Sequence, residues 1–160
     1  MGANDTDSTV ISECIVLGIP IIDRQHANLI RITNNLNFAC QKGLDTANLR
    51  FINAVNEAVD YVKYHFSTEE KLMVLLEYPE LIQHKREHGD FVWEIICCAK
   101  QFEEGQELVP EKFAAFLGKW IYTHIASSDK MFADYFGGMN HHSKLRLILG
   151  GRPQLSANYA

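Results

Sequence analysis

The sequence predicts an all-α protein, folded as one up-down-up-down antiparallel four-helix bundle with an N-terminal arm and a short C-terminal extension. Of its 160 residues, 47% are hydrophobic, which suits one compact core, and the length is too short for two ordinary domains. From Ile22 onward, apolar residues recur every three or four positions, as they do along one face of a helix. Glycines and prolines divide this pattern into four long segments. We therefore expect an arm over residues 1–14, the bundle over residues 15–137 and a tail over residues 138–160.

The first two helices are delimited by residues that stop helices. The first is expected to run from about Asp23 to Lys42, because Gly43 follows. The second is expected to begin near Asp45, and its apolar stripe continues until Pro79 forbids further helix. The predicted inward residues are Ile22, His26, Leu29, Thr33, Leu36 and Cys40 in the first helix and Phe51, Val55, Ala58, Val62, His65, Glu69, Leu72 and Leu76 in the second.

The third and fourth helices follow from the same signals. The third is expected to begin beside Pro79 and to end near Gly105, and the fourth to run from Pro110, a good first-turn residue, to Gly137. Short links between amphipathic helices favour antiparallel neighbours. The predicted inward residues are Leu81, His84, His88, Phe91, Ile95, Cys98 and Phe102 in the third helix and Phe113, Leu117, Trp120 and His124 in the fourth.

Composition excludes several classes of function. A formal net charge of -5 gives no global attraction to nucleic acid or to an anionic membrane surface. No apolar run reaches the roughly 18 residues of a membrane span, and residues 1–8 lack the features of a signal peptide. The cysteines Cys14, Cys40, Cys97 and Cys98 form no CxxC pair, so we expect free thiols and a cytoplasmic location.

Six polar residues on the inward stripes point to a buried site. Burying an unpaired imidazole or carboxylate costs several kcal/mol, so polar residues at inward positions need partners. Pairs four residues apart stack on one helix face, and two such pairs occur here. Every predicted helix contributes at least one of these residues, which are His26, His65, Glu69, His84, His88 and His124.

Asp129 is a further candidate whose position the sequence leaves open. It follows His124 by five residues, so an ideal helix turns it about 140° away from that histidine. A single-turn π-bulge around Ser127 and Ser128 would return it to the inner face. The apolar pattern beyond Asp129 fits both registers: Phe132 and Phe136 match the shifted one, whereas Met131 and Tyr135 match the unshifted one.

Four short motifs, one in each predicted helix, give the chain its resemblance to a known family. They are GIPIIDRQH at residues 18–26, HFSTEE at 65–70, HKREH at 84–88 and WIYTHIASSD at 120–129. In this order they resemble the hemerythrin family, and the bacterial hemerythrins in particular, over residues 15–136. The resemblance implies a four-helix bundle that holds a non-haem di-iron centre.

The resemblance also implies a role for each residue of the site. His84, His88 and His124 would be terminal ligands of one iron, His26 and His65 those of the other, and Glu69 and Asp129 would bridge both. With an oxo or hydroxo bridge, the two-histidine iron would keep one position of its octahedron open for an exogenous ligand. The remaining histidines, His141 and His142, lie in the tail and are expected to be solvent-exposed.

Pocket residues are carried over from the family in the same way. The positions near the open iron correspond to Leu29, Phe66, Trp120 and Ile121, all of which are also ordinary core residues for a bundle. Ile121 stands where the family commonly has leucine. The tryptophan that is frequent in the family's N-terminal arm is absent, and the arm has Ile11, Ile15 and Val16 instead.

The leading functional hypothesis is a non-enzymatic protein that binds dioxygen reversibly, for storage, delivery or buffering. The imidazole-rich set lacks the Glu-x-x-His pairs of carboxylate-rich di-iron bundles, which favours binding over oxidation chemistry. The alternatives are a redox enzyme that reduces peroxide or nitric oxide, an oxygen or redox sensor, and an iron store or donor that involves Cys97 and Cys98. Zinc is disfavoured, because its structural sites use four ligands and usually thiolates. A protein partner or self-association through the basic, apolar stretch Lys144–Leu149 stays open.

Overall fold

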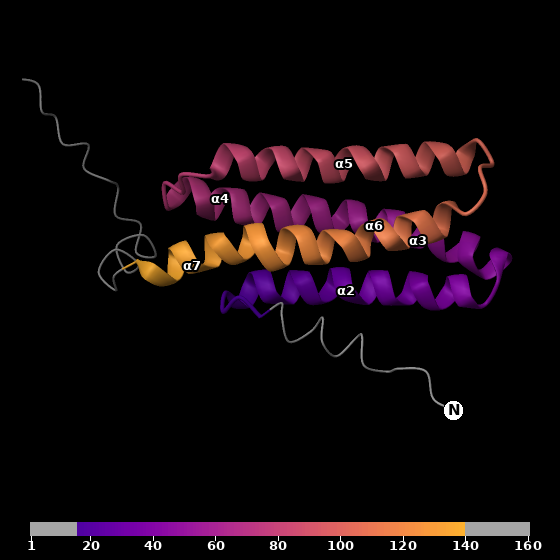
Figure 1. Ribbon diagram of the computed structural model, residues 1–160, viewed down its shortest axis with the longest axis horizontal. Helices are drawn as coiled ribbons and strands as arrows, with labels where there is room; N and C mark the ends of the chain where they lie inside the picture. Colours follow the sequence, from indigo (N-terminus) through magenta and orange to yellow (C-terminus); the bar gives the residue numbers. More distant parts are fainter. Residues whose placement is uncertain (1–15, 140–160) are drawn as a thin grey trace, which may run out of the picture.

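The computed structural model describes residues 16–139, and this part of the chain is all-helical and contains no strand. Four helical rods lie lengthwise side by side and alternate in direction, as an antiparallel bundle requires (Figure 1). The predicted fold is therefore confirmed. The first rod is α2 (Pro20–Gln41), the second is α3 (Leu44–Tyr61) with η1 (Val62–Phe66) and α4 (Ser67–Leu75), the third is α5 (Leu81–Glu103), and the fourth is α6 (Val109–Trp120) with η2 (Ile121–Asp129) and α7 (Lys130–Gly138).

The helix ends lie close to the residues that were predicted to bound the helices. Helix α2 begins at Pro20, three residues before Asp23, and the Asp23 carboxylate accepts the backbone N–H of Leu17 at 2.7 Å and of Gly18 at 3.1 Å. The side chain thus ties the incoming segment to the first turn of the helix. At the other end, Gly43 has φ of +111°, a conformation that glycine adopts without a steric penalty.

Two rods change helical period beside the polar cluster. In η1 and η2 the hydrogen bonds close the wider i→i+5 turn of a π-helix. We predicted an uninterrupted α-helical stripe in the second rod, and η1 interrupts it. Beyond η1, Glu69 and Leu76 are buried as predicted, but Met73 is fully buried where Leu72, which is only partly buried, was predicted to face inward. The wider turn takes up an extra residue, which rotates the residues that follow it on the helix face.

In the fourth rod the π segment answers the question that the sequence left open. It begins at Ile121, well before the predicted bulge at Ser127 and Ser128. Phe132 is 1% exposed and Met131 is 56% exposed, so the shifted register is the correct one.

The apolar core has two parts, and the polar cluster lies between them. On α2, Leu29 of the larger cluster and Ile22 of the smaller cluster flank His26. Phe66 and Met73 flank Glu69 in the same way. The bundle therefore seals the polar residues from solvent at both ends.

Several expectations fall outside the described residues. They concern the arm, the tail, Cys14, His141, His142 and the stretch Lys144–Leu149. Within the described part, Cys40, Cys97 and Cys98 are free thiols, as expected. No helix in residues 16–139 is both long enough and apolar enough to cross a membrane.

Candidate metal centre

The structure brings all seven sequence-predicted metal ligands into one buried cluster. Each of the four rods contributes, and no member is more than 2% exposed. The π geometry of η2 is what allows two residues five apart to take part together, because one π turn spans about that distance along the chain. The members are His26 on α2, His65 on η1, Glu69 on α4, His84 and His88 on α5, and His124 and Asp129 on η2.

The ligand atoms fall into two groups that share both carboxylates. Within each group the nitrogen and oxygen atoms lie within 4.8 Å of one another, which is close enough to surround a single metal ion. One group has three histidines and the other has two, and Glu69 and Asp129 belong to both. The first group is Glu69, His84, His88, His124 and Asp129, and the second is His26, His65, Glu69 and Asp129.

Individual distances show how the shared carboxylates are placed. Glu69 Oε2 lies 3.4 Å from His65 Nε2 and 3.2 Å from His84 Nε2. Asp129 Oδ2 lies 3.1 Å from His26 Nε2, and its Oδ1 lies 3.0 Å from His124 Nε2. Each carboxylate therefore contacts histidines of both groups, as a bridging ligand of two metal ions would.

The cluster lacks internal hydrogen-bond partners for many of its atoms. Buried polar atoms are nearly always hydrogen-bonded in native proteins, so a group of exceptions needs an explanation. The Nε2 atoms of His26 and His65 also face each other at 3.3 Å. Cations between these atoms would satisfy the lone pairs, so the residues present fit a pair of metal ions. The inward-facing atoms without partners are Glu69 Oε1, His88 Nε2, His124 Nε2 and both oxygens of Asp129.

Three of the histidines are hydrogen-bonded through Nδ1, the ring nitrogen that faces away from the cluster. His124 Nδ1–H donates to Glu87 at 2.7 Å, and His88 Nδ1–H donates to Glu70 at 3.0 Å. His65 Nδ1–H donates to the amide oxygen of Gln25 at 3.1 Å. These bonds favour the tautomer in which Nε2 carries a free lone pair, and they orient each ring.

The supporting partners differ in charge between the two groups. Two histidines of the three-histidine group donate a hydrogen bond to a carboxylate. In the two-histidine group, His65 donates to the neutral amide of Gln25, and His26 Nδ1 has no partner. Burial raises the pKa of Glu87, but hydrogen bonds from Ser128 and His124 outweigh it and hold that pKa below its ordinary value. Glu87 thus stays ionised, and it makes the three-histidine group the more electron-rich of the two.

Burial sets the ionisation of the cluster itself. It lowers the pKa of His65 and His84, which favours the neutral imidazoles that bind metals. Burial, helped by the nearby Asp129 charge, raises the pKa of Glu69 to about 8. Burial also acts to raise the pKa of Asp129, but His124 and His26 hold it well below its usual range. Without metal, the second carboxylate charge is therefore costly to bury.

The four predicted pocket residues are all buried and lie in the larger apolar cluster. Two of them cover the three-histidine group: Phe66 stacks on His88 with centroids 3.6 Å apart, and Trp120 stacks on His124 at 3.9 Å. Leu29, one turn after His26, and Ile121 complete the set with exposed fractions of 0% and 1%. Apolar groups thus enclose the metal-facing atoms on the side of the larger cluster.

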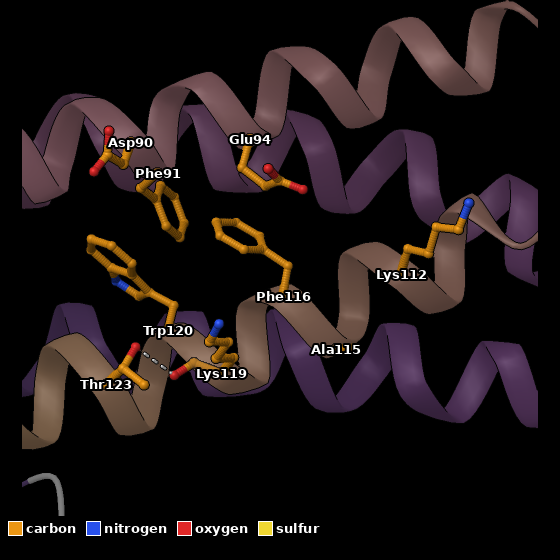
Figure 2. A pocket seen from close by; sticks show the side chains of 9 residues that line it. All are labelled: Asp90, Phe91, Glu94, Lys112, Ala115, Phe116, Lys119, Trp120 and Thr123. Atoms are coloured by element: carbon orange, nitrogen blue, oxygen red, sulfur yellow. Dashed lines mark hydrogen bonds between the residues drawn. The ribbon is translucent and has the colours of Figure 1, made fainter.

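Trp120 also forms part of a groove of about 640 Å³ on the outside of the bundle (Figure 2). The groove lies between α5 and α6, where the rings of Phe91, Phe116 and Trp120 converge. Charged side chains of both signs surround these rings. Trp120 stacks on His124 as well, so its side chain contacts both the groove and the polar cluster. The groove is lined by Asp90, Phe91, Glu94, Lys112, Ala115, Phe116, Lys119, Trp120 and Thr123.

Sequence reasoning missed the supporting residues. Gln25, Glu70 and Glu87 each precede or follow a cluster residue in the chain, yet each supports a histidine on a different helix. Their sequence neighbours therefore gave no indication of their partners. Tyr61 was also missed, although its position one turn before His65 could have drawn attention to it. Its ring stacks on that of His65 with centroids 4.6 Å apart.

Comparisons with known proteins agree with this geometry. Residues 17–136 match the family described as the hemerythrin HHE cation binding domain. The chain is 32% identical over 118 residues to a bacteriohemerythrin of Stenotrophomonas maltophilia, covering 74% of each chain. It is 31% identical to a Pseudomonas aeruginosa bacteriohemerythrin over 73% of this chain and 74% of the relative. A Clostridium acetobutylicum bacteriohemerythrin is 28% identical over 74% of this chain and 93% of its own length.

Proposed function

The chain belongs to the hemerythrin family, and from this premise we propose that it holds two iron ions and binds dioxygen reversibly, without turning over a substrate. The observation that carries the proposal is the sharing of Glu69 and Asp129 between two groups of histidines. Two carboxylates that each contact both groups suit a pair of metal ions rather than two separate ones.

The choice of iron rests on the chemistry and number of the donors. Imidazole and carboxylate together suit iron, and they suit a structural zinc site poorly, since such a site is tetrahedral and usually contains thiolates. The protein offers five ligands to one ion and four to the other. The position with fewer protein ligands, beside His26 and His65, is where a small exogenous ligand has room to bind.

When bound, the iron pair supplies the electrons and the open coordination position that reversible dioxygen binding requires. The side chains do the rest. Leu29, Phe66, Trp120 and Ile121 keep water away from the site, and water exclusion protects a reactive ligand from side reactions. Gln25 holds the ring of His65 in its ligating orientation.

A reversible spectroscopic titration tests the proposed function. The anaerobically reduced protein, with its iron content measured, is exposed to air and then freed of oxygen again. We expect two irons per chain, a visible charge-transfer band that develops with oxygen, and loss of that band when oxygen is removed. Immediate and irreversible conversion to a ferric spectrum would contradict reversible binding.

The same sample discriminates the alternative functions. Catalytic turnover of peroxide or nitric oxide with an added reductant would indicate a redox enzyme. Rapid loss of iron to a weak chelator would indicate an iron donor. Stoichiometric, reversible binding with tightly held iron is the result that the proposed function predicts.

A further inference from the structure

The hydroxyl group of Tyr61 is buried next to the metal centre and has no hydrogen-bond partner. Tyr61 is the last residue of α3 and is 3% exposed. Its oxygen makes no hydrogen bond with any described residue. A buried hydroxyl without a partner forfeits its interaction with water, which destabilises the folded protein. The residue therefore occupies a position where phenylalanine would be the more stable choice.

A second unpartnered donor, the indole N–H of Trp120, lies in the same region. Trp120 is 7% exposed, and its Nε1 has no partner among the described residues. Phe66 and Phe91 contact both rings: the Phe66 centroid is 5.7 Å from that of Tyr61 and 6.1 Å from that of Trp120. The corresponding distances from Phe91 are 6.1 and 4.6 Å. The two polar groups are thus set among the same apolar rings.

The Tyr61 side chain lies against the two-histidine group. Its ring stacks on that of His65, with centroids 4.6 Å apart and planes 23° from parallel. A phenol hydroxyl is a hydrogen-bond donor. Tyr61 therefore brings an unpartnered donor next to one of the two histidines of this group.

We propose that the Tyr61 hydroxyl, assisted by the Trp120 indole N–H, donates a hydrogen bond to the outer atom of a small ligand bound beside His26 and His65. This inference rests on the proposed function, since it requires the metal pair. The stacking of Tyr61 on His65 puts it beside the two-histidine group, to which the protein offers fewer ligands. The ligand class is a diatomic or triatomic molecule whose outer atom accepts a hydrogen bond, such as dioxygen or azide.

Tyr61 therefore makes the pocket selective as well as dry. A ligand with an acceptor at its outer end satisfies the buried hydroxyl, whereas an apolar ligand of equal size leaves it unsatisfied. Sites built to hydrogen-bond a ligand discriminate strongly against analogues that cannot reciprocate, because the buried group then stays unpaired. Phe66 and Phe91, which carry no polar atom, enforce the position of the two donors.

Azide binding to the diferric protein tests the inference. Tyr61→Phe is compared with wild type and with Tyr64→Phe, a matched control on the same rod whose side chain is 70% exposed. Loss of one hydrogen bond is expected to raise the azide dissociation constant about 3- to 10-fold in Tyr61→Phe. Tyr64→Phe is expected to bind azide as the wild type does. Equal constants in all three proteins, with two irons per chain, would overturn the inference and leave the proposed function intact.

A metal-free measurement separates a ligand-binding hydroxyl from a structural one. In the presence of a chelator, urea unfolding of Tyr61→Phe should show a midpoint equal to or higher than that of the wild type, because the hydroxyl has no partner to lose. A lower midpoint would identify a structural hydrogen bond and contradict the inference. A wild-type protein that holds no iron pair would overturn both this inference and the proposed function.

Discussion

Glu69 and Asp129 come from different rods of the bundle, and each carboxylate contacts a histidine of both ligand groups. Glu69 Oε2 lies 3.4 Å from His65 and 3.2 Å from His84, while Asp129 lies 3.1 Å from His26 and 3.0 Å from His124. Neither carboxylate can therefore be assigned to one group alone. This sharing is why we propose that the two groups form a single centre for two ions.

Removing one shared carboxylate should destroy the pair. Asp129→Ala takes a ligand from both ions at once, so we expect iron to fall from two per chain to one or none, with loss of the visible spectrum. The matched control is Asp134→Ala, five residues further on, whose carboxylate pairs with Lys130 on the exposed surface. Iron analysis and absorption spectra check the result. Two irons with an unchanged spectrum in Asp129→Ala would exclude a bridging role.

The metal-free protein should be stabilised by Glu69→Gln at high pH. The pKa of Glu69 is raised to about 8 in the folded state, above its ordinary value of 4.5, so folding favours the protonated form. Its ionisation therefore costs stability as pH rises from about 4.5 to 8, and the full cost remains above pH 8. Glutamine resembles the protonated acid and avoids that cost.

Urea unfolding in chelator at pH 5 and at pH 8.5 measures this effect. We expect the variant to exceed the wild type in unfolding free energy at pH 8.5 and to differ little from it at pH 5. The same substitution should reduce iron content, because the amide is a poor bridging ligand. A wild-type advantage at pH 8.5 in the metal-free state would show that Glu69 ionises there without cost.

Glu87→Gln should lower the affinity for metal, although Glu87 is not itself one of the proposed ligands. The amide oxygen still accepts the N–H of His124, but the negative charge that strengthens this imidazole as a donor is gone. Partners of this kind typically account for about 10- to 100-fold in metal affinity. Iron transfer to a competing chelator provides the measurement, with Glu94→Gln on the same helix as the control. Identical iron transfer by the two variants would show that Glu87 does not contribute to metal affinity.

Ile121→Thr should accelerate oxidation of the reduced, oxygen-bound protein. Ile121 is 1% exposed, and threonine keeps the β-branch but replaces the ethyl group with a hydroxyl that can hold water near the proposed metals. The loss of the ethyl arm also leaves space beside the new hydroxyl, so we expect a several-fold faster appearance of the ferric spectrum. Ile82→Thr is the control, because Ile82 is 63% exposed on α5. Equal rates for the two variants would mean that Ile121 does not guard the site.

The fold could be predicted nearly in full because the signals that encode it are local. A glycine or proline lies near each end of every predicted rod, and an apolar stripe runs between them. The structure moves the ends only slightly: α2 begins at Pro20, and α4 ends at Leu75, shortly before Pro79. The inward polar residues were visible for the same reason, since they interrupt apolar stripes. Their assignment as ligands stays a prediction.

The helical period could not be predicted. A π turn needs no special residue type, so Ser127 and Ser128 could be proposed as a bulge only to explain the five-residue step to Asp129. In the second rod no such conflict appeared, because His65 and Glu69 are four apart and also fit an α-helix. There the change of period showed only in the structure, as the burial of Met73 instead of Leu72.

Contacts between rods were equally invisible to the sequence. Glu87 adjoins His88 in the chain but supports His124, and Glu70 adjoins Glu69 but supports His88. Tyr61 resembled any aromatic core residue until its hydroxyl proved to have no partner. These features depend on the relative placement of helices, which an amphipathic pattern does not specify.

Anomalous diffraction at the iron absorption edge, from crystals of the iron-loaded protein, tests the central claim most directly. The account predicts two iron peaks inside the bundle, one bound by His84, His88 and His124 and the other by His26 and His65, with Glu69 and Asp129 reaching both. A single peak, or two peaks that share neither carboxylate, would contradict it.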